Sequence, residues 1–222
     1  MAKQLLIIGD SFCHGIGTAS TVKHPDNLKF AFGKHLAEYF NLEYVNLAEP
    51  GISILRTVEL GYEYLKHNHD QVERVIIGWT NPNRIGLYAG QSSLQILPSF
   101  VWLGDTGSDD IFVEYENGVK FVADKNNKDN LSPLPALHKL VVENDLFNQT
   151  SLSTMAMDLF KVWLEKYSIP YYDFSVFGQI ADVKLSTSFN AIMPVNRHPT
   201  IDEQKLFADL LIKELTKNEN LS

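Results

Sequence analysis

The sequence predicts an α/β fold of three layers, in which helices cover both faces of a doubly wound, flavodoxin-like, mainly parallel sheet of five strands. Two observations carry this prediction. Short apolar runs suited to buried strands alternate along the chain with segments whose apolar residues recur every three or four positions, as on one face of a helix. Hydrophobic residues make up 45% and charged residues 21% of the 222, a composition typical of globular chains with a substantial core. Alternation of this kind favours a parallel sheet between two helical layers.

The elements follow one another in a regular order. The first strand is a continuous apolar run that ends at Gly9, as expected of a strand buried on both faces. Thr200 and Glu203, three residues apart, predict a capping box at the start of the last helix. The expected elements are strand 5–8, helix 27–40, strand 43–47, helix 55–65, strand 75–77, helix 152–163, strand 169–174 and a helix from about 200 to 215.

The alternation stops between about residues 85 and 149. Within that interval, two β-rich runs at 111–115 and 119–122 flank Glu116-Asn117-Gly118 and predict a β-hairpin. We therefore expect one domain over residues 1–222, carrying an insertion that contains the hairpin and shapes substrate access.

Charge and cysteine content exclude several classes of protein. The net charge of −8 lacks the basic surface that binding to nucleic acid requires. A single cysteine, Cys13, excludes an internal disulfide and a cysteine-pair zinc site, and neither a metal site nor a phosphate-binding glycine motif is evident. We expect no cofactor and no metal.

The N-terminal apolar run of four residues is much shorter than a signal-peptide core or a membrane span. We therefore expect a cytoplasmic protein that does not bind membranes. Release by lysis or a place in a virus particle is compatible with this, and the sequence does not indicate an oligomeric state.

A serine stands at the point where chemistry is expected in such a fold. Gly9-Asp10-Ser11 directly follows the first strand, and ligand sites of open parallel sheets lie beyond the carboxyl ends of the strands. A serine hydroxyl is a weak nucleophile at neutral pH, so it needs a base within hydrogen-bond reach and donors for the developing oxyanion.

Four blocks supply these groups in a recognisable order: Gly9-Asp10-Ser11, Gly51, Asn81 and His198-Pro199. This order resembles the SGNH (GDSL-type) hydrolase superfamily, of which the chain looks like a divergent member. The resemblance implies that Ser11 is the nucleophile and His198 its base. It also implies an oxyanion hole formed by the Ser11 amide, the Gly51 amide and the Asn81 side chain.

The implied activity is hydrolysis of an acyl ester of a small molecule or a carbohydrate, of esterase or deacetylase type, through a seryl-acyl intermediate. The spacing of the blocks and the stretch 79–84 are also similar to SGNH-like proteins found in viruses of bacteria.

Two positions depart from the pattern of the superfamily. Where its third block reads Gly-x-Asn-Asp, this chain has Trp79-Thr80-Asn81-Pro82, so Asn83 is an alternative to Asn81. Where the superfamily has an aspartate three residues before the histidine, this chain has Val195. The carbonyl of Pro194 or Val195, or the Asn196 side chain, would then have to orient the imidazole.

These departures leave two other functions open. One is a binding or structural protein that keeps the SGNH fold with impaired catalysis. The other is a flavodoxin-like module that binds a nucleotide, which would share the sheet but would have no need of His198-Pro199.

Five further residues flank the blocks and are candidates for substrate contact: Asp10, His14, Trp79, Arg84 and Arg197. Each also has an ordinary structural explanation. Asp10 would brace the turn before Ser11, and His14 would be an exposed loop residue. Trp79 would pack in the core, and the two arginines would be surface charges.

Overall fold

The computed structural model describes residues 3–19, 24–80, 111–114, 120–123, 149–176, 178, 180–192 and 197–219. The chain divides into two compact units, one formed by residues 1–81 and 156–222 and the other by residues 82–155. The expectation of a single domain with an insertion at about 85–149 stays a prediction.

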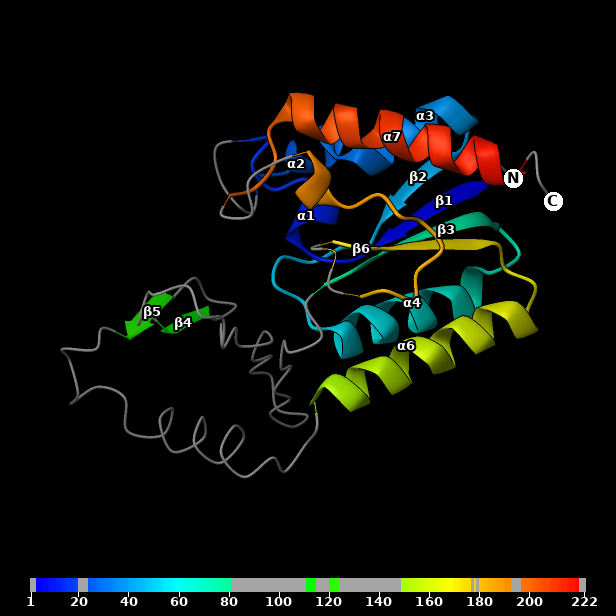
Figure 1. The fold of residues 1–222 in the computed structure, drawn as a ribbon, viewed down its shortest axis with the longest axis horizontal. Helices are drawn as coiled ribbons and strands as arrows, with labels where there is room; N and C mark the ends of the chain where they lie inside the picture. The colour runs from blue at the N-terminus through cyan, green and yellow to red at the C-terminus, as the bar shows by residue number, and fades with distance from the viewer. Residues whose placement is uncertain are drawn as a thin grey trace. The chain divides into compact units, whose positions relative to one another are not determined.

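The larger unit is built around a parallel sheet of four strands, with the order β2-β1-β3-β6 (Figure 1). Its strands are β1 (Gln4–Ile8), β2 (Glu43–Asn46), β3 (Val72–Trp79) and β6 (Tyr171–Ser175). The predicted α/β class with a parallel sheet is therefore correct. Among the described residues this sheet has four strands, and the expected fifth strand is not one of their elements.

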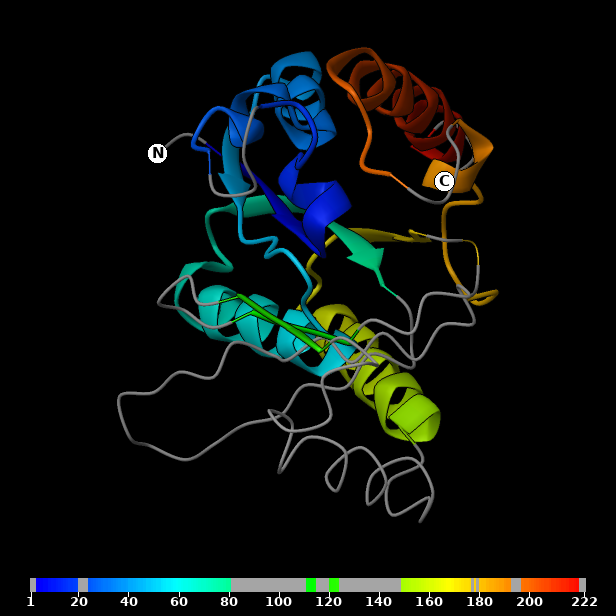
Figure 2. The same ribbon diagram turned by 90° about the vertical axis from the view of Figure 1, so that its left-hand side faces the viewer.

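Helices cover both faces of this sheet (Figures 1 and 2). On one face lie α3 (Phe32–Phe40) and α7 (Ile201–Glu219), and on the other lie α4 (Ile54–Asn68) and α6 (Gln149–Lys166). Alternate residues of β1 pack against the two helical layers, because successive side chains along a strand point to opposite faces of the sheet. Leu5 and Ile7 pack in the core beneath α3 and α7, and Leu6 and Ile8 pack in the core beneath α4 and α6.

The helix expected over 27–40 is interrupted. It consists of α2 (Asn27–Phe30) and α3, separated by Ala31 with an extended backbone at φ −65° and ψ 146°. The Phe32 amide at the start of α3 donates to the side-chain oxygen of Gln204, 172 residues away, at 2.9 Å. Apolar periodicity could not reveal this break, because the group that caps α3 comes from the other end of the chain.

The remaining elements are short. A single turn, α1 (Ser11–His14), follows β1, and a 3₁₀ turn (Phe189–Ala191) lies between β6 and α7. In the smaller unit, β4 (Ile111–Glu114) and β5 (Lys120–Ala123) pair antiparallel. No helix in the described parts of the chain is both long and apolar enough to cross a membrane.

Candidate active site

Ser11 is the first residue of α1, at the carboxyl end of β1. The turn is held by Asp10, whose Oδ1 accepts a hydrogen bond from the Phe12 amide at 3.0 Å and whose Oδ2 accepts one from the Thr80 hydroxyl at 3.0 Å. Asp10 is fully buried, so it caps α1 and ties it to the residue that follows β3. This agrees with the expected bracing role. A side chain without exposed surface is not placed to touch a substrate.

His198 reaches the serine from the other end of the chain. Its Nε2 lies 3.0 Å from Ser11 Oγ, a hydrogen-bond distance across 187 positions in sequence. Ser11 is 7% exposed, whereas His198 is exposed, so the pair lies where a buried turn meets the surface. In the tautomer with its proton on Nδ1, the imidazole accepts the serine proton at Nε2.

The His198 segment also packs against Phe12 and Gly17, which lie close to Ser11 in the sequence. Its centroid lies 5.2 Å from that of the Phe12 ring. Gly17 lies against the backbone of the same segment: a Cβ on Gly17 would stand 2.7 Å from the Pro199 carbonyl oxygen and 2.8 Å from His198 Cβ. Because Gly17 also has a φ of +97°, only glycine fits here without strain.

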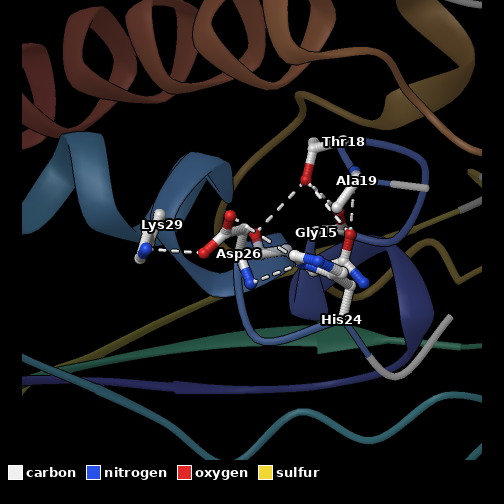
Figure 3. Close-up of polar contacts among 7 residues, drawn as sticks. Gly15, Thr18, Ala19, His24, Asp26 and Lys29 are labelled. Carbon is white, nitrogen blue, oxygen red and sulfur yellow. Dashed lines mark hydrogen bonds and ion pairs between the residues drawn. The ribbon is translucent and has the colours of Figure 1, made fainter. Parts of the chain in front are cut away.

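The loop that carries Gly17 is anchored by hydrogen bonds to its own neighbours (Figure 3). The Thr18 hydroxyl donates to the Gly15 carbonyl at 2.7 Å, and the Ala19 amide donates to the side-chain oxygen of Asn27 at 3.0 Å. Asn27 is fully buried. At the rim of this loop, Lys29 pairs with Asp26, an exposed contact that adds little to stability.

Two side-chain amides from different elements hold α1. Asn46, the last residue of β2, donates to the Cys13 carbonyl at 3.0 Å, and Gln204 donates to the Phe12 carbonyl at 2.9 Å. Neither residue was identified from the sequence. A signal for Gln204 was present, because it lies three and four positions before Phe207 and Ala208 and so places an amide on the apolar face of α7.

Gly51 lies in the loop between β2 and α4. It is buried, with a φ of +77°, and its loop runs beside the serine's strand because the Glu49 amide donates to the Gly9 carbonyl at 3.1 Å. Ser53 closes the loop by capping α4 through the Arg56 amide at 3.3 Å. Ser11 and Gly51 thus follow adjacent parallel strands at one edge of the sheet, as the sequence predicts.

Two other candidates are engaged in contacts within the fold. Trp79 is fully buried and its indole NH donates to Asp173 Oδ2 at 2.7 Å, so it packs in the core, and its expected contact with substrate stays a prediction. Arg197 is exposed, and its guanidinium donates to both carboxylate oxygens of Glu203 at 2.7 and 2.5 Å. Because the pair is exposed it is weak, and the expected contact of Arg197 with substrate stays a prediction.

The blocks at Asn81 and Asn83, together with Arg84, lie outside the described residues, as do Pro194, Val195 and Asn196. Their expected roles stay predictions.

Burial makes both other titratable residues of α1 harder to charge. It raises the pKa of the Cys13 thiol well above its ordinary value, and the neighbouring Asp10 carboxylate raises it further. Burial also lowers the pKa of His14, which keeps that imidazole neutral at physiological pH. Cys13 is therefore a packed residue whose thiol is not activated as a nucleophile.

No model of a protein family and no curated protein matches the chain. Among solved structures, it is similar to a protein described as lipolytic and of the G-D-S-L family from Desulfitobacterium hafniense. The identity is 13%, 96% of this chain and 99% of that chain are covered, and the TM-score is 0.40.

A lipase from a goat rumen metagenome is similar at 12% identity, with 96% of this chain and 97% of that chain covered and a TM-score of 0.45. An acetyl xylan esterase from Butyrivibrio proteoclasticus is similar at 14% identity, with 98% and 64% covered and a TM-score of 0.40. At these identities the chemistry of the chain has to be derived from its own residues.

Proposed function

We propose that the chain is a serine hydrolase that cleaves acyl esters, with Ser11 as the nucleophile and His198 as the general base. The observation that carries the proposal is the 3.0 Å separation between Ser11 Oγ and His198 Nε2. A hydroxyl at the first position of a strand-to-helix turn, with an imidazole nitrogen in hydrogen-bond reach, is the arrangement that activates a serine.

The reaction follows from this geometry in two halves. His198 takes the proton from Ser11 Oγ as this oxygen attacks the ester carbonyl carbon, and the tetrahedral intermediate then expels the alcohol, which receives the proton from His198. In the second half, His198 takes a proton from water, and the hydroxide equivalent attacks the acyl-serine. Release of the carboxylic acid returns the proton to Ser11 Oγ.

The oxyanion of each tetrahedral intermediate needs donors. We assign the Ser11 and Gly51 backbone amides to it, with the Asn81 side chain as the third donor implied by the resemblance to SGNH hydrolases. The first-turn amides of a helix have no partner within the helix, so the Ser11 amide is suited to this task. Removing one such donor typically lowers turnover by about 10² to 10³-fold.

The substrate we propose is an ester of a small molecule or of an acetylated carbohydrate. The pairing of Arg197 with Glu203 argues against recognition of a charged group by that residue. Short neutral acyl esters are therefore the first compounds to test.

Position 195 is a valine, where SGNH hydrolases have an aspartate. This favours a second candidate, a protein that keeps the fold and binds a ligand without efficient turnover. In serine proteases, disabling the triad acid lowers turnover by about 10⁴-fold while catalysis stays measurable. The two candidates differ in whether Ser11 is activated, and this can be measured directly.

The test combines labelling and turnover. The wild type, Ser11→Ala and His198→Ala are incubated with a fluorophosphonate, the modified residue is mapped by mass spectrometry, and hydrolysis of p-nitrophenyl acetate and butyrate is followed. Ser186→Ala is the matched control, because its exposed hydroxyl donates to Glu214 at 3.0 Å and lies outside the pair. We expect labelling at Ser11 and turnover in the wild type and the control, and neither in the two site variants. A wild type that neither labels nor hydrolyses would overturn the proposal in favour of the binding protein.

A further inference from the structure

Gln204 joins three parts of the chain through one buried side chain. It is the fourth residue of α7 and fully buried; its Nε2 donates to the Phe12 carbonyl at 2.9 Å and its Oε1 accepts from the Phe32 amide at 2.9 Å. A buried amide with both its donor and its acceptor used is fixed in orientation, because turning it over would place donor against donor and acceptor against acceptor. Its two partners are therefore held at fixed positions relative to α7.

The hydrogen bond from Gln204 to the Phe12 carbonyl fixes the turn that carries Ser11. Phe12 follows Ser11 directly, and α1 has only one turn, so fixing the Phe12 carbonyl fixes the turn that presents the hydroxyl. Such a turn has little stability of its own, because helices this short are not stable without external contacts. Its position depends on the groups that hold it.

The backbone of Gln204 connects the bridge to the histidine. His198 precedes α7 and has coil backbone, and its place depends on where α7 begins. The Gln204 amide donates to the Thr200 carbonyl at 2.9 Å, and the Glu203 carboxylate accepts from the Thr200 amide at 2.8 Å. Only Pro199 separates Thr200 from His198, so the first turn of α7 transmits its position to the imidazole.

We infer that Gln204 is a positioning residue, whose side-chain amide sets the separation between Ser11 Oγ and His198 Nε2 by holding α1 to the start of α7. This inference rests on the proposed function for its catalytic consequence, although the coupling itself can be measured without turnover. Asn46 holds α1 as well, but it comes from β2, and its hydrogen bonds to Cys13, Tyr44 and Ala48 do not involve the first turn of α7.

The decisive experiment is a double-mutant cycle read by NMR. The titration midpoint of the His198 imidazole is measured in the wild type, Ser11→Ala, Gln204→Met and the double variant, with His198→Gln used to assign its signal. Methionine keeps the length of the side chain and loses both hydrogen bonds. We expect the change caused by Ser11→Ala to shrink in the Gln204→Met background. An equal change in both backgrounds, in folded proteins, would overturn the inference.

Kinetics supply a second, independent measurement. Gln204→Met should lower kcat by about 10 to 100-fold while KM for p-nitrophenyl acetate stays within about twofold, because a displaced base slows chemistry more than it weakens binding. Leu215→Ala is the matched control: this fully buried residue of α7 lies about 16 Å further along the helix, and its loss destabilises α7 without removing the bridge. An equal loss of kcat in folded Leu215→Ala would assign the effect to helix stability and overturn the inference.

A Gln204→Glu variant adds a signature that a general loss of stability would not produce. Its protonated carboxyl can donate to the Phe12 carbonyl, whereas its carboxylate would face that oxygen with a like charge. Burial raises the pKa of such a carboxyl, so kcat relative to the wild type should recover as the pH falls. A ratio of kcat values that does not change with pH would count against the bridge.

The failure of this inference can be told apart from the failure of the proposed function. If the wild type fails to label with a fluorophosphonate, the proposed function fails, while the NMR cycle still decides whether Gln204 couples Ser11 and His198.

Discussion

Replacing Gly17 with alanine tests whether the packing behind His198 controls the site. The new Cβ would stand 2.7 Å from the Pro199 carbonyl oxygen and 2.8 Å from His198 Cβ, so the segment must move away from it. Backbone and Cβ atoms cannot turn aside as the end of a flexible side chain can. The strain therefore falls on the residue that carries the imidazole.

The size of the movement follows from these contacts. Restoring an ordinary contact requires His198 Cβ to move by about 0.7 Å, since close-packed carbon atoms stand about 3.5 to 4.0 Å apart. Moved by that amount along the hydrogen bond, Nε2 would lie about 3.7 Å from Ser11 Oγ instead of 3.0 Å, beyond hydrogen-bond reach. A misplacement of about 1 Å costs roughly 10²-fold in rate, so we expect kcat/KM to fall by about 10 to 100-fold.

The substitution should also lower stability, so activity has to be measured per folded molecule. A non-glycine residue at a φ of +97° costs about 1 to 3 kcal/mol, and each 1 kcal/mol lowers Tm by about 2 to 4 °C in a domain of this size. The assays are p-nitrophenyl acetate hydrolysis and the rate of fluorophosphonate labelling, both per folded molecule, with thermal unfolding followed by circular dichroism.

Gly61→Ala is the matched control. Gly61 lies in α4, on the face of the sheet opposite to α7, and its Cβ would stand 2.8 Å from the side-chain ends of Ile8 and Phe160. It should alter Tm and leave activity per folded molecule unchanged. Wild-type activity in folded Gly17→Ala would refute the reasoning.

Three further predictions concern residues around the pair. Hydrogen bonds from Arg197 and Thr200 lower the pKa of Glu203 to about 2. The carboxylate therefore stabilises the fold above its ordinary pKa of 4.5, and this contribution is lost as the pH falls towards 2, so the Tm deficit of Glu203→Gln should shrink over that range. Asp10→Ala should lower the free energy of unfolding by about 1 to 3 kcal/mol in urea titrations, and Asp10→Asn by less, because the amide oxygen can still cap α1. Equal losses in the two variants would contradict the capping role. Native Cys13 should resist iodoacetamide and react only after denaturation, as mass spectrometry would show, because burial raises the pKa of its thiol.

The sequence by itself determined the class of fold and the local elements of the site. The apolar run of β1 is buried on both faces, and the amphipathic segments that become α4 and α7 pack on opposite sides of the sheet, as the periodicity predicts. The Thr200–Glu203 capping box is confirmed by its hydrogen bonds. These features depend on residues a few positions apart, so the chain encodes them locally.

Only the tertiary structure decided which distant groups meet. It placed His198 within 3.0 Å of Ser11, used Gln204 to break the helix expected over 27–40, and buried Trp79 against Asp173. Each of these contacts joins residues more than 90 positions apart, so it depends on how the layers pack and not on any local pattern. The motif order indicated which residues could form a catalytic pair, and packing alone set the hydrogen-bond distance between them.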